Sequence, residues 1–532
     1  MHSIRTRRWL LAIWLCFLVR GWFYCSMLPL WEGYDEFSHF GVIRAIAVRG
    51  ILLPPRDQAG PRDVEESLKL APVPWEVRGW EVFRTSLTEE EYWNLPVVER
   101  TAREDRLRNL PPAWQRQDST GGISAYEAYQ PPLYYWLMAP VVYALRGAGL
   151  LAQVMALRWI GVALTSLAIP LTFAIALALT RCDRAALGCC AVLAVMPELA
   201  SNVARISNEP LAILLFTLLV WVGIRILQQE PDVKGAGLLG GILGLGLLTK
   251  AYFLAAVPAV LLLLVYRYRN ARAAMLTGAA LPVAIAGWWY ARNAATTGTL
   301  SGLAEPVMLR RTGAGAMLSA IPSIPWRHAT DVILTTHLYF CGWSSLTVRG
   351  WMYHVFFAVV ALVAVGLVAQ LRRPGIWLWP AAIYGFFWLG QLYNVVLQYM
   401  TKGLAGSMGW YMYAVVGAEV TLCAVAFGRW RVPALWAGAV LFALLDLYGM
   451  HWLAIPYYTG IIGHRANGAL AAMHVGEMRA LGFHAIFERL AVNKCAVISR
   501  WFLMVLWFLY LAGTVGAAAM VWPTRERKGK PA

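Results

Sequence analysis

The sequence predicts an all-α polytopic membrane protein with about 12 transmembrane helices. Of its 532 residues, 59% are hydrophobic and 14% are charged, whereas soluble domains carry about 25% charged residues. The mean hydropathy is +0.55. Apolar runs long enough to cross a hydrocarbon core about 30 Å thick recur along the chain. These observations exclude an ordinary soluble protein.

The net charge of +17 does not indicate a nucleic-acid partner. Lys and Arg occur in short clusters between the apolar runs, which is the pattern that sets membrane topology. The 8 cysteines lie mostly within or beside apolar runs and lack the spacing of a metal site or a disulfide scaffold. We interpret them as packing residues, of which only Cys341 and Cys495 are placed to meet an oxidising compartment.

The first apolar run, 9–30, follows Arg5, Arg7 and Arg8. No small-x-small cleavage site follows it, so we interpret 1–30 as a signal anchor with a cytoplasmic N-terminus. Further spans are expected near 157–180, 185–200, 210–227, 235–250, 252–266, 274–291, 351–371, 376–398, 410–428, 432–453 and 497–521.

The predicted membrane orientation of all later spans depends on whether segment 131–147 crosses the membrane. If it does not cross the membrane, most basic residues in the middle of the chain face the cytoplasm, as short basic loops do. We therefore predict that 131–147 lies in or re-enters the outer leaflet and that both termini are cytoplasmic. A tilted transmembrane helix is the alternative.

This topology leaves three extracytoplasmic segments, 31–156, 292–350 and 454–496. In the first, acids alternate with arginines and prolines, and its aromatic residues predict amphipathic helices at the membrane interface. The remaining parts are transmembrane bundles over 157–291 and 351–453, then 497–532, which holds the last span and a basic cytoplasmic tail with Arg525, Arg527 and Lys528.

Two adjacent acids, Asp35 and Glu36, come directly after the first span. Carboxylates at the water–lipid boundary are costly unless they are paired or functional. If Asp35 begins a helix, His39 shares its face four residues later. Asp35 could then act as a base toward a hydroxyl group. The alternative is a helix N-terminus at which acids favour the exposed amides.

A second polar cluster runs from Tyr126 to Tyr135 and contains Glu127, Gln130 and Tyr134. Its two consecutive prolines fix an extended entry, and the aromatic residues suit an interfacial helix or a sugar-stacking surface. The alternative is a signal that merely ends one helix and starts another.

Later spans place further polar residues at the same expected depth: Arg205, Asn208, Glu209, Lys250 and Arg292. The cations could neutralise a lipid phosphate, because Arg offers bidentate hydrogen bonds and Lys a point charge. Taken singly, each cation could instead be a side chain that snorkels to the interface.

Some charges inside predicted spans need a different account, namely Arg20, Glu419 and Asp446. An isolated charge at that depth costs roughly 2.5–3.5 kcal/mol. We predict that Arg20 pairs with one of the two acids as a structural lock.

The order of these motifs resembles the GT-C superfamily of integral-membrane glycosyltransferases. The motifs are Asp35-Glu36, Gln130-Pro131-Pro132-Leu133-Tyr134-Tyr135, Ser207-Asn208-Glu209, Leu248-Thr249-Lys250 and Trp289-Tyr290-Ala291-Arg292-Asn293. The likeness is closest to the bacterial branch related to protein O-mannosyltransferases and aminoarabinose transferases. It covers roughly residues 1–300 in motif order and the remainder in topology.

The resemblance implies a transferase that moves a sugar from a polyprenyl-phosphate carrier to an acceptor hydroxyl on the outer face of the cytoplasmic membrane. It makes Asp35 the base, with Glu36 and Glu127 as further catalytic acids, and assigns the donor phosphate to Lys250 and Arg292. The chain departs from the family at Gln130, where relatives often carry His or Lys, and at Trp410, where many carry Arg.

From the residues themselves we add Arg205 to the phosphate-binding cations. The candidate substrate-binding residues are His39, Gln130, Tyr134, Asn208 and Glu209. We expect no obligatory metal, because the acids are not spaced as a metal motif. A divalent ion, which oligosaccharyltransferase relatives use, remains the alternative.

The main rival function is a transporter or flippase for a lipid-linked or anionic solute. Such a function would account for the spans and the basic residues, but it would not explain the acid pair at the start of the long segment 31–156. A ligase or polymerase that uses a diphosphate carrier is a further rival, and its large outer loop usually comes late in the chain. The acceptor, whether lipid, glycan or protein, is left open.

Overall fold

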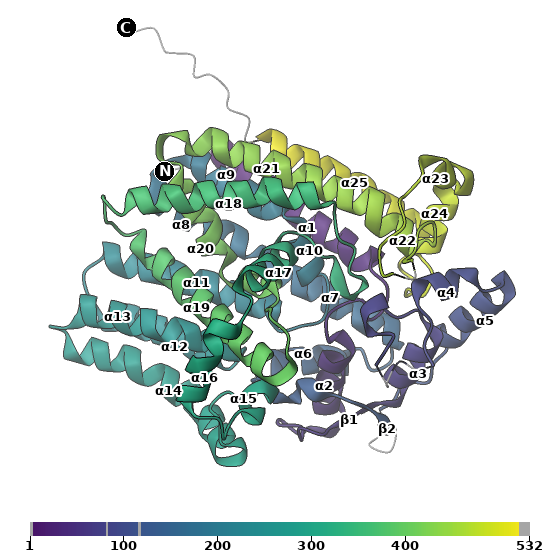
Figure 1. Cartoon of the computed structure of the whole chain (residues 1–532), viewed down its shortest axis with the longest axis horizontal. Coiled ribbons are helices and arrows are strands. Elements are labelled where there is room, and N and C mark those ends of the chain that lie inside the picture. Colours follow the sequence, from purple (N-terminus) through teal and green to yellow (C-terminus); the bar gives the residue numbers. More distant parts are fainter. Residues whose placement is uncertain (1–3, 81–82, 84, 115–118, 466, 521–532) are drawn as a thin grey trace, which may run out of the picture.

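The computed structural model describes residues 4–80, 83, 85–114, 119–465 and 467–520. It is built almost entirely from helices (Figure 1), so the predicted all-α polytopic class is confirmed. Within the described residues, 9 helical stretches are long and apolar enough to cross a membrane, and up to 10 if one bent pair counts as a span. About 12 spans were expected from the apolar runs.

The candidate spans follow the predicted runs closely. They are α1 (Ile4–Met27), α7 with α8 (Leu150–Ser166, Ala168–Thr180), α11 (Glu209–Gln228), η5 with α13 (Ala251–Ala256, Val257–Tyr268), α14 (Arg272–Thr297), α18 (Gly350–Gln370), η8 with α20 (Gly409–Val415, Val416–Ala426), the stretch Gly428–Tyr458 and α25 (Arg500–Met520). Within Gly428–Tyr458 lie η9 (Gly428–Trp430), α21 (Arg431–Tyr448), η10 (Gly449–Ala454) and α22 (Ile455–Tyr458).

The predicted span 185–200 is the bent pair. Helices α9 (Asp183–Val195) and α10 (Pro197–Val203) meet at an angle of 61°. Pro197 opens α10, and a proline supplies no amide hydrogen to continue the hydrogen bonding of α9. The bend turns α10 and the polar residues after it toward the long first segment.

Two further expected spans do not meet the length and hydropathy of a crossing helix. The run 235–250 gives α12 (Val233–Leu247), whose 15 residues rise about 22 Å. A Cβ on its Gly240 would lie 2.3 Å from the Gly278 carbonyl oxygen of α14, so small residues let these helices pack closely. The run 376–398 gives α19 (Leu378–Lys402), whose later turns carry polar side chains.

Segment 131–147 forms α6 (Leu133–Ala144). Its 12 residues rise only about 18 Å, less than the roughly 30 Å hydrocarbon core. This length agrees with the prediction that the segment does not cross by itself. At the opposite end of the bundle the Thr6 hydroxyl donates to Asp183 over 2.9 Å, so α1 and α9 begin at one level.

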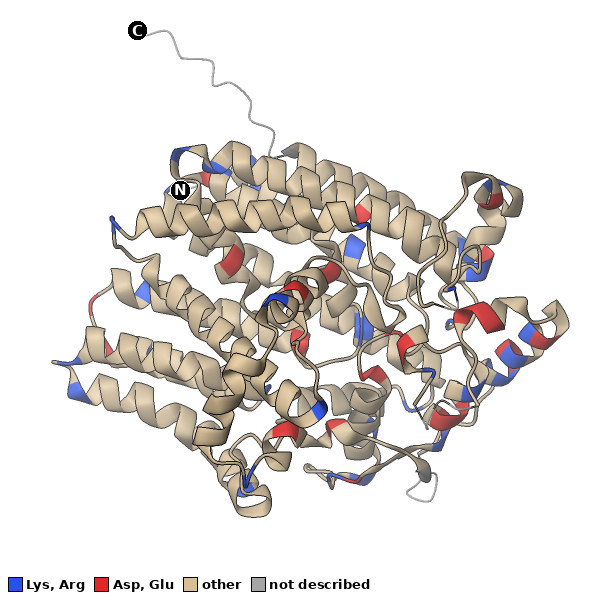
Figure 2. Ribbon diagram, in the orientation of Figure 1, with Lys and Arg blue, Asp and Glu red and all other residues tan. Residues whose placement is uncertain are grey.

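The first long segment is a compact unit at one end of the bundle, and it carries many of the charged residues (Figure 2). Besides α6 it contains α2 (Glu36–Arg49), β1 (Ala59–Pro61), α3 (Arg62–Leu70), η1 (Trp75–Val77), α4 (Glu89–Asn94), α5 (Val97–Arg108), β2 (Ser119–Ser124) and η4 (Tyr126–Tyr129). The antiparallel ribbon β1–β2 was not predicted. It brings the chain before η4 back to the end of α2.

Two other segments complete this end. Between α14 and α18 lie α15 (Ala304–Met308), α16 (Ala314–Ala320), η6 (Ile321–Ser323), α17 (Trp326–Leu338) and η7 (Gly342–Ser344); between α22 and α25 lie α23 (Val475–Leu481) and α24 (Phe483–Leu490). The expected basic tail at 525–528 lies outside the described residues.

The predicted lock of Arg20 is confirmed. Its Nη2 lies 2.9 Å from Asp446 Oδ2, with both side chains fully buried. The Tyr24 hydroxyl donates to the same carboxylate over 2.5 Å, and Arg20 Nε donates to Thr514 over 3.1 Å. The lock therefore joins α1, α21 and α25. The third intramembrane charge, Glu419, pairs with His337 at 2.9 Å.

Candidate active site

The turn between α1 and α2 sends two neighbouring acids in different directions. Asp35 has φ 56° and ψ 16°, in the left-handed region, which Asp tolerates better than most residues. Gly33 lets the turn approach the bundle, because a Cβ there would lie 2.6 Å from Arg205 Cβ. Glu36 then enters the protein interior while Asp35 stays half-buried.

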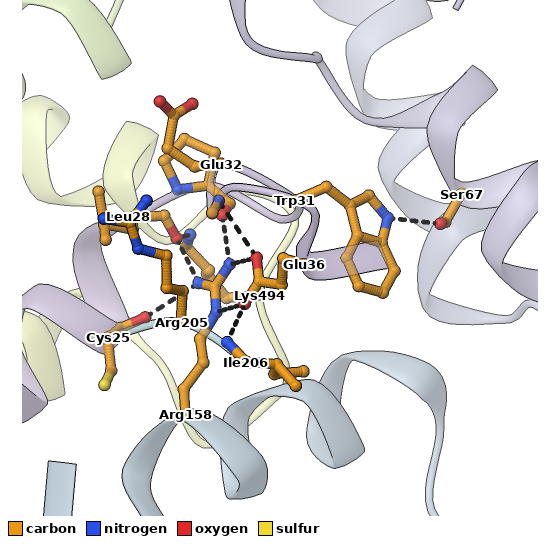
Figure 3. Close-up of polar contacts among 12 residues, drawn as sticks. Cys25, Leu28, Trp31, Glu32, Glu36, Ser67, Arg158, Arg205, Ile206 and Lys494 are labelled. Carbon is orange, nitrogen blue, oxygen red and sulfur yellow. Dashed lines mark hydrogen bonds and ion pairs between the residues drawn. The ribbon is translucent and has the colours of Figure 1, made fainter. Parts of the chain in front are cut away.

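Glu36 is held in what we call the Glu36 clamp, formed with Arg158 of α7 (Figure 3). Its two carboxylate oxygens accept from Arg158 Nε at 2.7 Å and Nη2 at 2.6 Å, and Oε1 also accepts from the Ile206 amide at 3.0 Å. Arg158 donates in addition to the carbonyls of Cys25, Leu28 and Pro29. Both side chains are buried and fully partnered, so the clamp fixes the turn beside Asp35.

Asp35 lies in a different environment, which we call the Asp35 cluster and define as Asp35, Glu127, Lys250 and Arg205. Its carboxylate accepts a hydrogen bond from the Tyr126 hydroxyl. Burial raises the pKa of Asp35, whereas the Tyr126 hydrogen bond and the charges of Lys250 and Arg205 oppose that rise. The acid therefore faces cations without a direct ion pair among the described residues.

Glu127 is the second acid of the cluster. Its amide donates to Ser38 Oγ over 2.9 Å and ties η4 to α2. Burial, followed by the negative charge of Asp35, raises the pKa of Glu127 to about 8, so this carboxyl keeps its proton at neutral pH. Its buried Oε2 has no hydrogen-bond partner among the described residues. Glu127 in its protonated form is therefore a hydrogen-bond donor in the cluster.

His39 does not orient the Asp35 side chain. Its Nδ1 lies 2.9 Å from the Tyr135 hydroxyl and 3.8 Å from Glu127 Oε2. Burial, aided by the charge of Lys250, holds the pKa of His39 well below its usual range. The neutral ring joins α2 to α6, and the orienting contact to Asp35 comes from Tyr126.

Lys250 follows α12, and Glu209 opens α11. Their side chains form an ion pair, and the Tyr252 hydroxyl donates to the other Glu209 oxygen over 2.6 Å. The Lys250 ammonium lies 5.1 Å from the ring centre of Tyr252 and 5.4 Å from that of Tyr411, within cation–π range. Asn208 Nδ2 donates to the Thr249 carbonyl over 3.1 Å and holds the end of α12 against α11.

Arg205 is buried beneath an aromatic stack. Its guanidinium carbon lies 3.9 Å from the ring centre of Tyr34, and that ring stacks on Trp410 with centres 3.7 Å apart. Nε donates to the Asn202 carbonyl over 3.0 Å, and Nη2 lies 3.8 Å from Glu198. In the described part of the chain, neither Nη atom has a hydrogen-bond partner. The guanidinium is fixed in place with donor capacity unused.

The remaining candidates lie around this cluster. Gln130 hydrogen-bonds to Glu127 and opposes the rise in its pKa. The Tyr134 hydroxyl is buried without a partner in the described ranges. Arg292 lies over the Trp289 ring at 5.3 Å, beside Arg56, and no contact between described residues joins it to Asp35. The charges of Lys250, Arg205 and Lys402 act on Asp35, whereas that of Arg292 is not among the leading influences on it.

A largely apolar pocket, whose empty space of about 250 Å³ includes open solvent, is lined in part by Gln130. Its walls include Val42 and Ile46 of α2, Tyr135 of α6 and Trp289 of α14. Hydrocarbon walls next to a charged cluster suit a ligand with one polar and one apolar end. Within the described ranges, no group of three or more His, Cys, Asp or Glu residues is arranged to hold a metal ion.

Sequence reasoning missed Arg158, Tyr126 and Glu198 as residues that build this site. For Arg158 a signal existed, because an arginine next to a long apolar run requires a partner. Glu198 lies in a predicted span and carries the same signal. For Tyr126 no pattern in the sequence shows that its hydroxyl reaches a carboxylate 91 residues away.

No protein-family model and no curated protein matches the chain. The chain is similar to two crystal structures of ArnT from Cupriavidus metallidurans, one bound to undecaprenyl phosphate and one in the apo state. Both structures are 13% identical in sequence to this chain. The bound structure has a TM-score of 0.49, and its alignment covers 96% of this chain and 76% of ArnT. The apo structure has a TM-score of 0.48, and its alignment covers 98% of this chain and 77% of ArnT.

Proposed function

We propose that the protein is a membrane glycosyltransferase that moves a sugar from a polyprenyl-phosphate carrier to an acceptor hydroxyl on the outer face of the membrane. The observation that carries this proposal is the Asp35 cluster, in which a half-buried acid shares one site with Lys250 and Arg205. Displacement at an anomeric carbon needs a base for the acceptor and positive charge for the departing phosphate. The cluster offers both.

In the proposed step, the acceptor oxygen attacks the anomeric carbon and its proton passes to the Asp35 carboxylate. The bond between the anomeric carbon and the phosphate oxygen breaks, and the electron pair leaves with the carrier phosphate. The Tyr126 hydrogen bond and the nearby cations favour the ionised form of Asp35. Glu127 in its protonated form avoids a second negative charge beside that phosphate.

Lys250 and Arg205 are the proposed phosphate-binding groups. The Arg205 Nη atoms make no hydrogen bond in the described part of the chain, and the ion pair of Nη2 with Glu198 is long, at 3.8 Å. Lys250 is bound to a single carboxylate that a phosphate can replace. The apolar pocket beside Gln130 is the proposed entry for the polyprenyl chain. We assign no metal to the step, so transfer should persist in EDTA.

The test is transfer by purified protein in detergent, using polyprenyl-phosphate donors with labelled sugars and lipid, glycan or protein acceptors. Release of carrier phosphate is expected with the wild type and not with Asp35→Asn. The matched control is Asp57→Asn, an exposed acid of the same segment, which should retain full release. Release that is unchanged in Asp35→Asn would contradict the proposed base.

A further inference from the structure

A second polar cavity lies on another side of the turn that carries Asp35. Its empty space, which includes open solvent, is about 320 Å³. It is lined by Pro29 and Leu30 after α1, by Trp93 of α4, and by Asn493 and Lys494 after α24. None of these residues belongs to the Asp35 cluster. We call this cavity the Lys494 pocket.

The pocket contains a buried base and a buried acid. Lys494 is 4% exposed and donates to the Leu28 carbonyl. Burial and the charge of Arg158 lower the pKa of Lys494 to about 7, against the opposing charges of Glu89, Glu36 and Cys495. No ion pair within 4.0 Å joins Lys494 to Glu89 in the part of the chain that the structure describes. A buried ammonium without a bound counter-charge is costly unless a ligand completes it.

Glu89 is the acid of the pocket and is 3% exposed. Its Oε2 accepts from Trp93 Nε1 over 3.0 Å. Burial raises the pKa of Glu89 well above its usual range; the charges of Glu32 and Glu90 add to the rise, and that of Lys494 opposes it. Burial therefore favours the protonated form of the carboxyl, which can donate a hydrogen bond.

The same cavity gathers polar atoms that the protein leaves unused. The Tyr92 hydroxyl lies within reach of the Asn493 side chain, and the Tyr458 hydroxyl within reach of Glu32. Neither hydroxyl, nor the amide oxygen of Asn493, makes a hydrogen bond of normal geometry to a described residue. Asn493 has φ 60°, in the left-handed region, which asparagine tolerates better than most residues. Buried polar groups that converge on one cavity without partners indicate a missing ligand.

We propose that the Lys494 pocket binds a phosphate group, from a lipid headgroup or from free phosphate, with Lys494 and Arg489 as cations and the Tyr92 and Tyr458 hydroxyls as donors. Arg489 already donates Nη1 to the Thr459 carbonyl over 2.5 Å, which leaves its other nitrogens for the ligand. Arginine and lysine together supply the fork and the point charge that phosphate sites use. This site is independent of the proposed transferase function.

The Lys494 pocket and the Glu36 clamp share a contact with the same turn after α1. The Leu28 carbonyl accepts from Lys494 and also from Arg158 Nη1, the latter over 3.0 Å, and Figure 3 shows the two cations on either side of this turn. If a bound phosphate accepts the hydrogen bond of Lys494 instead, the Leu28 carbonyl keeps only its hydrogen bond from Arg158. Occupancy of the pocket is therefore transmitted to the turn that holds Asp35.

The experiment measures the melting temperature of the full chain in a phosphate-free maltoside detergent during titration with sulfate, inorganic phosphate or a short-chain phosphatidic acid. Sulfate is the main probe because its charge does not change between about pH 6 and about pH 8.5. We expect sulfate to stabilise the protein in a saturable way. Its affinity should be about tenfold or more higher at about pH 6, where Lys494 is charged, than at about pH 8.5. Stabilisation by both inorganic anions identifies free phosphate as a ligand, and stabilisation by phosphatidic acid alone identifies a lipid headgroup.

The variants are Lys494→Met and Arg489→Gln, each expected to lose at least tenfold in anion affinity. Lys69→Met is the matched control, because Lys69 pairs with Glu65 and Glu66 at the surface and should bind like the wild type. If Lys494→Met does not fold, the anion affinity of Arg489→Gln, at the edge of the pocket, tests the proposal. The absence of saturable stabilisation by all three probes, or equal affinity in the wild type and both pocket variants, would overturn the proposal.

Discussion

Asp35 and Glu36 are neighbours in the chain and have opposite surroundings. In the Glu36 clamp, the carboxylate accepts two hydrogen bonds from Arg158 and one from the Ile206 amide. In the Asp35 cluster, the carboxylate accepts one strong hydrogen bond, from Tyr126, and faces cations at longer range. A charge whose partners are complete fixes geometry, whereas a charge whose partners are incomplete can still take a proton or a ligand.

The two arginines repeat this contrast. Arg158 uses its guanidinium nitrogens on Glu36 and on backbone carbonyls. Arg205 has only its Nε hydrogen-bonded within the described structure, and its Nη2 makes a longer ion pair with Glu198 at 3.8 Å. The clamp should therefore respond to mutation through stability, and the cluster through binding and rate.

The largest effect is expected for Asp35→Asn. Removing a general base should lower kcat by about 10²–10⁴-fold while leaving the melting temperature close to that of the wild type. Because burial raises the pKa of Asp35, the wild-type rate should fall with acidification at a pH above the ordinary aspartate value. The residual rate of Asp35→Asn should lack this acid limb. An acid limb retained in Asp35→Asn would assign the titration to another group.

Glu36→Gln should act on stability. It leaves Arg158 buried with its charge uncompensated, which typically costs about 3–5 kcal/mol. Denaturant or thermal unfolding in detergent would measure the loss. The double variant Glu36→Gln with Arg158→Met should recover part of the stability, since both charges are gone. A single variant as stable as the wild type would show that the clamp does not hold the turn.

Tyr126→Phe should produce a smaller change. It removes the hydrogen bond that favours the ionised form of Asp35, and a hydrogen bond to a charged group is worth about 1.5–3 kcal/mol. The acid limb of the rate profile should therefore move to higher pH by about one unit. An unmoved acid limb would separate Tyr126 from the titrating group.

Glu127→Gln should have the smallest effect and should stabilise the protein at alkaline pH. The folded-state pKa of Glu127 is about 8, above its value of about 4.3 in an unfolded chain. The folded state therefore binds more protons between these values, and stability falls as pH rises through that window. Replacing the acid removes this penalty, so the gain in stability should be larger at about pH 8.5 than at about pH 5. Equal melting temperatures at the higher pH would contradict the assignment.

The sequence anticipates the features of this molecule that depend on local composition. Apolar runs located the candidate spans, and the cost of a lone intramembrane charge predicted that Arg20 needs an acid, which proved to be Asp446. Glycines and polar side chains in 235–250 and 376–398 made those runs poorer spans than their average composition indicated.

The site itself depends on contacts between distant residues. Arg158 reaches Glu36 across 122 positions, and Tyr126 reaches Asp35 across 91. No periodicity encodes such pairings, because they follow from how the first segment folds back on the bundle. The sequence therefore identified Asp35, Glu127, Arg205 and Lys250 as candidates but could not separate the role of Asp35 from that of Glu36.

The most direct test of the account is equilibrium binding of polyprenyl phosphate to the wild type, Lys250→Met and Asp35→Asn, with the exposed Lys234→Met as a matched control. If one phosphate sits between the acid and the cation, Lys250→Met should weaken binding by about tenfold or more. Asp35→Asn should strengthen it by a smaller factor, because a repelling charge is removed. Changes of the same sign in both variants, or no change in either, would contradict the account.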